Sequence, residues 1–280
     1  GAAVNLGQAA WQTKLWLIDP YFKGKFGPVF LESELIYGWG KFADLDNSYA
    51  NLTNVDVSTW GFYLHARADI SMFYGGFAFA WVSGDDPGTP DKIEGGLASL
   101  AVFQMGQNWS PTLIFKNDDH ATYTGGITGA LARTSSWGTG STLATGGTSP
   151  LAGVGGANAT NQFMDNIWFY QLYFGVKPTP KLDIVAKISY AYADKKPWAT
   201  PATLGVLNST GNSATEYGSS QYGTEVDLIA TYKIYDNLQY MVGFGYFWTG
   251  DYYKGYVPEG ATDPKLANDY LLMHRLTLTF

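Results

Sequence analysis

Apolar and polar residues alternate one by one along several long stretches of this chain. In the segment 222–234 one parity is almost wholly apolar (Val226, Leu228, Ala230, Tyr232, Ile234), and the other carries Glu225, Asp227, Thr231 and Lys233. Successive side chains of a strand point to opposite faces, so this pattern predicts a sheet with one apolar and one mostly polar face. It predicts strands at 10–24, 28–40, 55–68, 71–83, 165–177, 181–194, 222–234, 238–249 and 268–280.

The composition decides where such a sheet would lie. Aromatic residues make up 16% of the 280 residues and charged residues only 15%, with no break that separates two cores. A soluble sandwich also alternates, but its outward face would carry more charge than this chain has. No run approaches ~18 apolar residues, so a chain that crosses a membrane would cross it as strands. We therefore predict one domain over 1–280, an all-β antiparallel transmembrane β-barrel.

The links between the strands alternate in length, which predicts the orientation. Short links occur at 25–28, 69–70, 178–180 and 235–237, and long ones cover about 41–54, 84–164, 195–221 and 250–267. Tight periplasmic turns opposite long external loops are typical of bacterial outer-membrane barrels. The last strand ends on Phe280, and we interpret this terminal aromatic residue as a membrane-insertion signal. We expect outer-membrane lipid, lipopolysaccharide and the barrel-assembly machinery as partners.

Nine strands is an awkward number, because single-chain bacterial barrels have an even count. Either a strand within 97–116 is missed by the pattern, or the chain begins partway through a larger even-stranded barrel. We favour the second interpretation, because Gly1 to Ala10 is too small and polar for a strand. The N-terminus lacks the features of a signal peptide, so an exported protein would be seen here in mature or trimmed form.

Four glycine-aromatic motifs suggest a family. The run Gly24–Gly40, the loop entry Trp81–Pro87, and the segments Tyr222–Leu228 and Tyr246–Asp251 resemble the alginate-export-like outer-membrane porins. The resemblance covers 20–90 and 165–280, and falls on what would be the C-terminal part of those larger barrels. It implies a channel, and the family's alginate exporter is known for a basic, Arg-lined conduit that suits a polyuronate.

The parity of this chain predicts a different lumen. The inward charged residues are acids at Glu32, Glu34, Asp183, Glu225, Asp227 and Asp269, and bases at Arg67, Lys187, Lys233 and Arg275, with His65 beside them. A mixed, slightly acidic lumen favours a porin for small solutes or oligosaccharides over an alginate conduit, and predicts weak cation selectivity. The net charge of −7 argues against nucleic acid as a partner.

We expect passive passage of a solute and no enzymatic reaction. The pairs Glu32 with Glu34 and Glu225 with Asp227 could do acid and base work or bind Ca²⁺, but such carboxylates in a barrel usually brace the wall against inward bases. The alternative function is a structural sleeve, a barrel that encloses or docks a partner protein. An outer-membrane hydrolase ranks last, because no Ser-His-Asp spacing stands out.

Two loop regions carry further hypotheses. Asp85, Asp86, Asp91 and Glu94 form an oxygen-rich cluster that could bind Ca²⁺ in an external loop, although its spacing is not that of an EF-hand and solvated acids are the default. No other cofactor is expected. The long region 84–164 contains an apolar stretch, 97–115, that needs burial. It could fold into the pore mouth as a constriction, or form a lid on neighbouring loops or a subunit contact.

Overall fold

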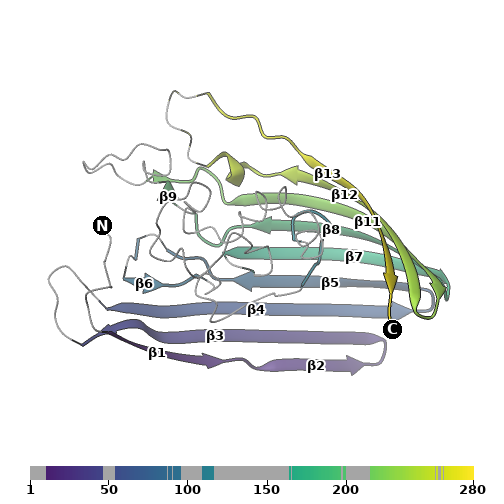
Figure 1. The fold of residues 1–280 in the computed structure, drawn as a ribbon, viewed down its shortest axis with the longest axis horizontal. Helices are drawn as coiled ribbons and strands as arrows, with labels where there is room; N and C mark the ends of the chain where they lie inside the picture. The colour runs from purple at the N-terminus through teal and green to yellow at the C-terminus, as the bar shows by residue number, and fades with distance from the viewer. Residues whose placement is uncertain are drawn as a thin grey trace.

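All nine predicted strand segments lie in one sheet in the computed structural model (Figure 1). The structure describes residues 11–46, 54–86, 88–89, 91–95, 109–116, 164, 166–196, 198–199, 215–255, 257, 260 and 262–280. Its elements are β1 (Trp11–Ile18), β2 (Tyr21–Phe26), β3 (Val29–Leu45), β4 (Val55–Ile70), β5 (Phe73–Val82), β6 (Lys92–Ile93), β7 (Ile167–Thr179), β8 (Leu182–Tyr192), β9 (Trp198–Ala199), β10 (Thr215–Glu216), β11 (Gln221–Tyr235), β12 (Leu238–Thr249), the 3-10 helix η5 (Asp251–Lys254) and β13 (Asp269–Leu278).

The strands follow the order β1-β3-β4-β5-β7-β8-β11-β12-β13, and each neighbouring pair is antiparallel. The first predicted segment, 10–24, is divided at Asp19 and Pro20 into β1 and β2, which both pair with β3. Proline has no N–H to give to a ladder, so a break at this position is expected. The backbone N–H of Leu35 still bonds the Pro20 carbonyl at 3.1 Å, which keeps the two pieces on the same edge.

The tight turns lie at one end of the sheet, and the strand ends that the long links join lie at the other, as predicted (Figure 1). Gly27 and Ser71 adopt positive φ of 60° and 57° in two of the tight turns. The second turn lies at 71–72, two residues beyond the predicted 69–70, because β4 continues to Ile70. The C-terminus, Phe280, lies at the short-turn end.

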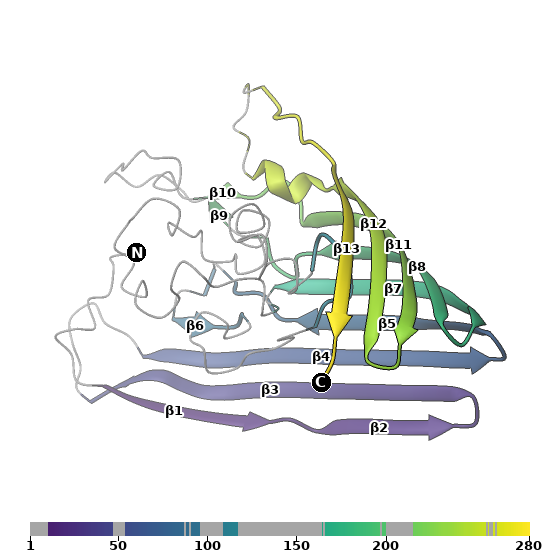
Figure 2. The same cartoon turned by 45° about the vertical axis from the view of Figure 1, so that its right-hand side comes forward.

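The sheet is open within the described part of the chain. It bends strongly along its width, and β1 with β2 forms one edge while β13 forms the other (Figure 2). The all-β antiparallel architecture is therefore confirmed, whereas a closed barrel stays a prediction. The described part of the candidate tenth strand, 109–116, is not a strand, and 97–108 lies outside the described residues.

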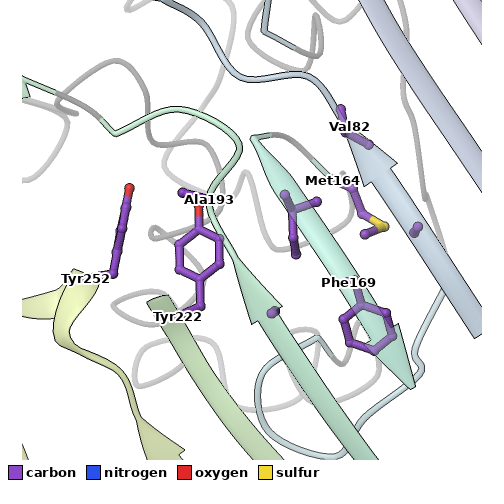
Figure 3. Packing of buried hydrophobic residues seen from close by; sticks show 9 residues of the cluster. Val82, Met164, Phe169, Ala193, Tyr222 and Tyr252 are labelled. Atoms are coloured by element: carbon purple, nitrogen blue, oxygen red, sulfur yellow. The ribbon is translucent and has the colours of Figure 1, made fainter. Parts of the chain in front are cut away.

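The two faces of the sheet differ as the alternation predicts. Large apolar side chains such as Leu172, Leu228 and Leu272 are more than half exposed on what we call the outer face. The opposite inner face carries two buried clusters. The larger one lies near the long-link end and contains residues of β5, β7 and β11, together with Met164 and with Tyr252, which belongs to η5 (Figure 3). Within the described residues, no helix is long and apolar enough to cross a membrane.

Candidate functional site on the inner face

Polar side chains of the inner face are aligned across the sheet by its register. Asp227 is paired with Lys187, Lys187 with Tyr173, Tyr173 with Gly76, and Gly76 with Arg67. A neighbouring row, offset by two residues along each strand, joins Glu225, Ser189, Gln171, Ala78, His65 and Glu32. Residues far apart in the sequence thus form continuous rows on one face.

A short piece of the long 84–164 link lies against these rows. We call residues 109–116 the inward segment. The carboxylate of Glu225 accepts three successive backbone N–H groups from it, those of Leu113, Ile114 and Phe115, at 2.9, 2.7 and 2.8 Å. Consecutive N–H groups that converge on one point form a natural anion site, and hydrogen bonds to a carboxylate are stronger than neutral ones. Glu225 therefore holds the turn of the segment to β11.

The start of the inward segment is held by donors instead. The carbonyl oxygen of Pro111 accepts from Nζ of Lys187 at 2.9 Å and from Nε2 of Gln171 at 2.8 Å. Donors of the wall thus bind the carbonyl at the start of the segment, and an acceptor of the wall binds the N–H groups of its turn. This arrangement fixes the direction of the segment as well as its position.

Two glycines of β12 make space for the segment. A Cβ at Gly243 would meet Leu113 Cδ1 at 2.9 Å, and one at Gly245 would meet Leu113 Cβ at 3.2 Å and the Asp227 carboxylate at 2.8 Å. Glycine within a strand often marks a close approach of another group. Leu113 and Ile114 are each 5% exposed and pack with Phe247 in the second buried cluster.

The segment covers the carboxylates that the sequence assigned to the open lumen. Glu225 and Asp227 point to the inner face, as parity predicts, but they are only 1% and 0% exposed. The prediction that these two acids line a water-filled passage is therefore not supported by their placement. Parity predicts the face on which they lie, but only the fold reveals what lies on top of them.

The inner face of β2 to β5 carries the charges that stay accessible. Glu32 accepts a hydrogen bond from the Tyr21 hydroxyl and lies 3.8 Å from Nζ of Lys23 and 4.0 Å from His65. Arg67 forms a two-pronged pair with Asp69, whose shortest N···O distance is 2.7 Å.

On β8, Asp183 accepts from the Tyr74 hydroxyl at 2.5 Å and lies 3.7 Å from Nζ of Lys177. The partners Tyr74, Tyr173 and Gln171 were not among the predicted site residues. Their inward parity on β5 and β7 was the signal that could have found them.

The remaining predicted lumen residues are more scattered. Glu34 is half-buried and lies near Asp19, at the break between β1 and β2. Lys233 pairs with Asp236 of the tight turn at 3.0 Å, so it belongs to the rim. Asp269 and Arg275 lie on the half-buried face of β13, beside Phe247 and Met241 of β12. Phe280 is fully exposed at the C-terminus.

The acidic loop cluster has its own protein partners. Asp85 accepts the backbone N–H of Glu94 at 3.0 Å, Asp86 accepts that of Gly88 at 2.9 Å, and Glu94 pairs with Lys92 at 2.6 Å. Burial raises the pKa of Asp85, whereas the Gly88 N–H lowers the pKa of Asp86. The backbone carbonyl of Asp91 accepts the N–H of Asp56. The described residues contain no group of three acidic or His side chains arranged to hold a metal, so the calcium hypothesis gains no support.

Aromatic rings gather in two bands on the outer face. Near the long links, Trp81 stacks with Trp168 at 5.3 Å, and both indole N–H groups donate to Asp194 at 3.1 and 2.6 Å. Near the short turns, Phe73 stacks with Phe174 at 5.8 Å. The long-link band also includes Trp60, Tyr190, Tyr192 and Trp248, and the turn band Phe22, Phe26, Tyr232 and Tyr240.

Comparisons with known proteins give a sparse result. No protein-family model matches the chain, and no curated protein sequence matches it. Among solved structures, the chain is similar to one described as "NanC porin structure in rhombohedral crystal form", with 5% identity over 95% of this chain and 94% of that chain and a TM-score of 0.33. Similarity at this level carries no argument about function, which must come from the residues themselves.

Proposed function

We propose that this chain forms the wall of an outer-membrane channel for passive passage of small solutes, and that the inward segment narrows it. The observation that carries the proposal is the contrast between the faces. The outer face exposes Leu172, Leu228 and Leu272 between two aromatic bands, while the inner face carries ion pairs and hydrogen-bonded polar rows. An apolar band flanked by aromatic girdles, with a polar interior, is the arrangement that lipid and a wet lumen impose on strands.

The spacing of the two bands agrees with a bilayer. Phe73 and Trp81 are eight residues apart on β5 and belong to the turn band and the long-link band. At roughly 3.3 Å per residue the distance along the strand is about 26 Å. The apolar band of outer-membrane barrels is about 25 Å tall, and at their usual strand tilt of roughly 35–45° this separation corresponds to about 20 Å along the membrane normal, close to the height of the band.

The constriction hypothesis is favoured over a lid on neighbouring loops. A lid would be held by loop residues, whereas the inward segment is bound by strand side chains that lie four or five residues in from the long-link ends: Gln171 of β7, Lys187 of β8 and Glu225 of β11. Bound there, the segment reduces the cross-sectional area that the wall leaves open to a solute. This favours a narrowed channel over an open one.

The relation to alginate-export-like porins stays a proposal, and the accessible charges argue against a polyuronate as cargo. Arg67 is engaged by Asp69 on two of its nitrogens, and Lys187 is directed at a backbone carbonyl. The described inner face therefore presents no row of unpaired bases. Glu32 and Asp183 remain accessible but lie beside Lys23 and Lys177, so the weak cation selectivity expected from the sequence stays a prediction.

Conductance in planar lipid bilayers tests the proposal. The purified chain should insert and give discrete current steps, with a reversal potential in a salt gradient that indicates mild cation preference. Asp183→Asn should shift that potential towards anions, most clearly at low salt, where screening is weak. A purified chain that is blocked or unstable in the bilayer without a partner protein would favour the structural sleeve, and strong anion selectivity would restore the polyuronate interpretation.

A further inference from the structure

A chain of aromatic rings lies beside the inward segment on the inner face. We call Phe30, Tyr63, His65, Tyr74, Tyr173 and Trp109 the aromatic lane. Trp109, the first residue of the inward segment, meets Tyr63 edge-on at 5.5 Å. His65 lies 6.5 Å from Tyr63 and 5.9 Å from Tyr173, and Tyr173 lies 6.3 Å from Tyr74. The rings therefore follow one another along the strands from the long-link end towards the tight turns.

Small residues of the wall make the rings lie flat. A Cβ at Gly76 would overlap the Tyr173 hydroxyl, and one at Gly175 would overlap the Tyr74 ring. Each ring thus crosses a glycine of the neighbouring strand instead of standing upright. The Tyr173 ring is fixed further by its 2.7 Å hydrogen bond to Nε2 of His65. The half-buried Tyr173 ring can turn one of its faces towards the interior, whereas Tyr74 is only 6% exposed beneath Arg67 and supports the lane from below.

The charges beside the lane are compensated. Lys23 lies 3.8 Å from Glu32, Lys177 lies 3.7 Å from Asp183, and Arg67 holds Asp69 while it covers the Tyr74 ring at 3.9 Å. These groups are accessible, with side-chain exposures of 21% for His65, 22% for Glu32 and 28% for Arg67. The lane thus combines ring faces with many hydrogen-bonding groups and little uncompensated charge.

This combination identifies the chemistry of a ligand. The electron-rich face of an aromatic ring favours the polarised C–H groups of a sugar ring, and the flanking carboxylates and hydroxyls can exchange hydrogen bonds with sugar hydroxyls. A purely apolar solute would leave those polar groups without water or partner, which is costly. An anionic polymer would meet Glu32 and Asp183, and the nearby bases Lys23 and Lys177 are already engaged by these carboxylates.

We propose that the aromatic lane is a binding track for uncharged oligosaccharides. The proposal rests on the channel function above and names its substrate class. The inward segment covers the wall at β8, β11 and β12. Among the described residues, β6 and Ser83 pack against the long-link end of β4, where Val57 and Thr59 are buried. The wall around His65 and Arg67 stays accessible, so we place the passage along it. Trp109 stands where the two regions meet.

Two measurements test the track, and only one of them needs conduction. Calorimetric titration of the detergent-solubilised full chain with maltohexaose should detect binding, and a hexameric oligouronate should bind more weakly at low salt. In bilayers, maltohexaose should interrupt the current reversibly. Tyr173→Ala should weaken both effects roughly three- to tenfold, the amount expected for one ring contact.

Matched variants separate the ring face from structural damage. Tyr173→Phe keeps the ring and should bind maltohexaose nearly as well as the unmodified chain, although it loses the bond to His65. Tyr232→Ala removes an outward ring and should leave binding unchanged. Tyr63→Ala replaces Tyr173→Ala if the latter fails to fold, with the same expected loss.

The outcomes distinguish the two proposals. A conducting channel that neither binds nor is interrupted by maltohexaose, or that prefers the oligouronate, overturns the track and leaves the channel function standing. Binding in detergent without any conductance supports the track and contradicts the channel. Equal losses in Tyr173→Ala and Tyr232→Ala would also overturn the track.

Discussion

Single side chains on the inner face have roles that depend on what covers them. Glu225 and Glu32 are both inward carboxylates of similar strand context, yet one is 1% exposed and binds backbone N–H groups, while the other is accessible beside Lys23 and His65. The physical difference is the presence of a packed segment above β11. At this scale the chemistry of a residue follows from its neighbours in space more than from its type.

Glu225 should control the position of the inward segment. In Glu225→Gln the three N–H groups lose their charged acceptor, so we expect opening of the segment to become easier by roughly 1–3 kcal/mol. The chain has no cysteine, so Thr112→Cys gives a single buried reporter, at a position that is 2% exposed in the parent. Labelling of the introduced thiol by a membrane-impermeant reagent should accelerate about 5- to 150-fold in the Glu225→Gln background.

Asp183→Asn is the matched control for this measurement. It neutralises an inward carboxylate that bonds Tyr74 and not the inward segment. If the introduced thiol is labelled in Glu225→Gln and in Asp183→Asn at the same rate as in Thr112→Cys alone, Glu225 does not hold the segment.

Asp85 should give its loop a dependence on pH. Its pKa is raised, because burial disfavours the charged form and Glu94 and Asp86 add negative charge nearby. A raised carboxyl pKa means that the folded loop binds the proton more tightly than the unfolded loop does. Protonation of Asp85 therefore stabilises the folded loop fully below the unfolded-state pKa of about 4, and this stabilisation is lost as the pH rises through the raised folded-state pKa. Protease resistance of 83–95 should therefore increase as the pH falls from about 7 towards 5.

The variant Asp85→Asn should abolish that change. Its amide oxygen can still accept the Glu94 N–H, but the side chain no longer titrates. The pKa of Asp86 is lowered, so protonation of Asp86 destabilises the folded loop. This opposite effect develops around and below the usual carboxyl pKa of about 4, outside the range from pH 7 to pH 5. The same pH response in the parent and in Asp85→Asn would assign the effect to another group.

At the scale of the strands, alternation and register determine on which face of the sheet each side chain lies. Leu228 of β11 is paired with Ala186 of β8 and Phe244 of β12, all on the outer face. Thr231, three residues later, is paired with Asp183 and Met241 on the inner face. A shift of one residue would exchange the two faces entirely, so the apolar outer face and the polar rows specify the same register.

This assignment predicts different responses to a charged side chain. Leu228→Arg should destabilise the inserted sheet by roughly 2–4 kcal/mol, because the guanidinium would face the apolar band at mid-strand. Thr231→Arg should cost less and should change ion selectivity instead. Unfolding in urea from lipid vesicles measures the first effect, and reversal potentials measure the second. Equal destabilisation at both positions would show that the faces are misassigned.

For the whole molecule, the ends of the sheet define an orientation. The tight turns and the C-terminus lie at one end, and the strand ends joined by the links 46–54, 83–166, 193–220 and 250–268 lie at the other (Figure 1). Within the described residues, the sheet edges at β1 with β2 and at β13 have no paired neighbour, and in lipid their backbone groups would need partners. A membrane-spanning form therefore requires that both edges be paired.

Protease treatment of intact bacteria tests the orientation. Cleavage should occur within 83–166 or 193–220 and should spare the tight turns at 27–28, 71–72, 180–181 and 236–237, which we place in the periplasm. Permeabilised cells serve as the control in which the turns become accessible. Cleavage of the tight turns alone in intact cells would invert the orientation.

The sequence by itself determined the strands, their two faces and the tight turns to within two residues, because alternation and turn chemistry are local properties. The division of the first strand at Pro20 was not predicted, although its cause, a residue without an N–H, is also local. Only the tertiary structure decided which inward charges stay accessible. The bonds between Glu225 and Leu113–Phe115 span more than a hundred residues, and no periodicity reports a contact of that separation. The flat placement of Tyr173 over Gly76 was likewise hidden, because it depends on two strands that meet only when β5 and β7 pair.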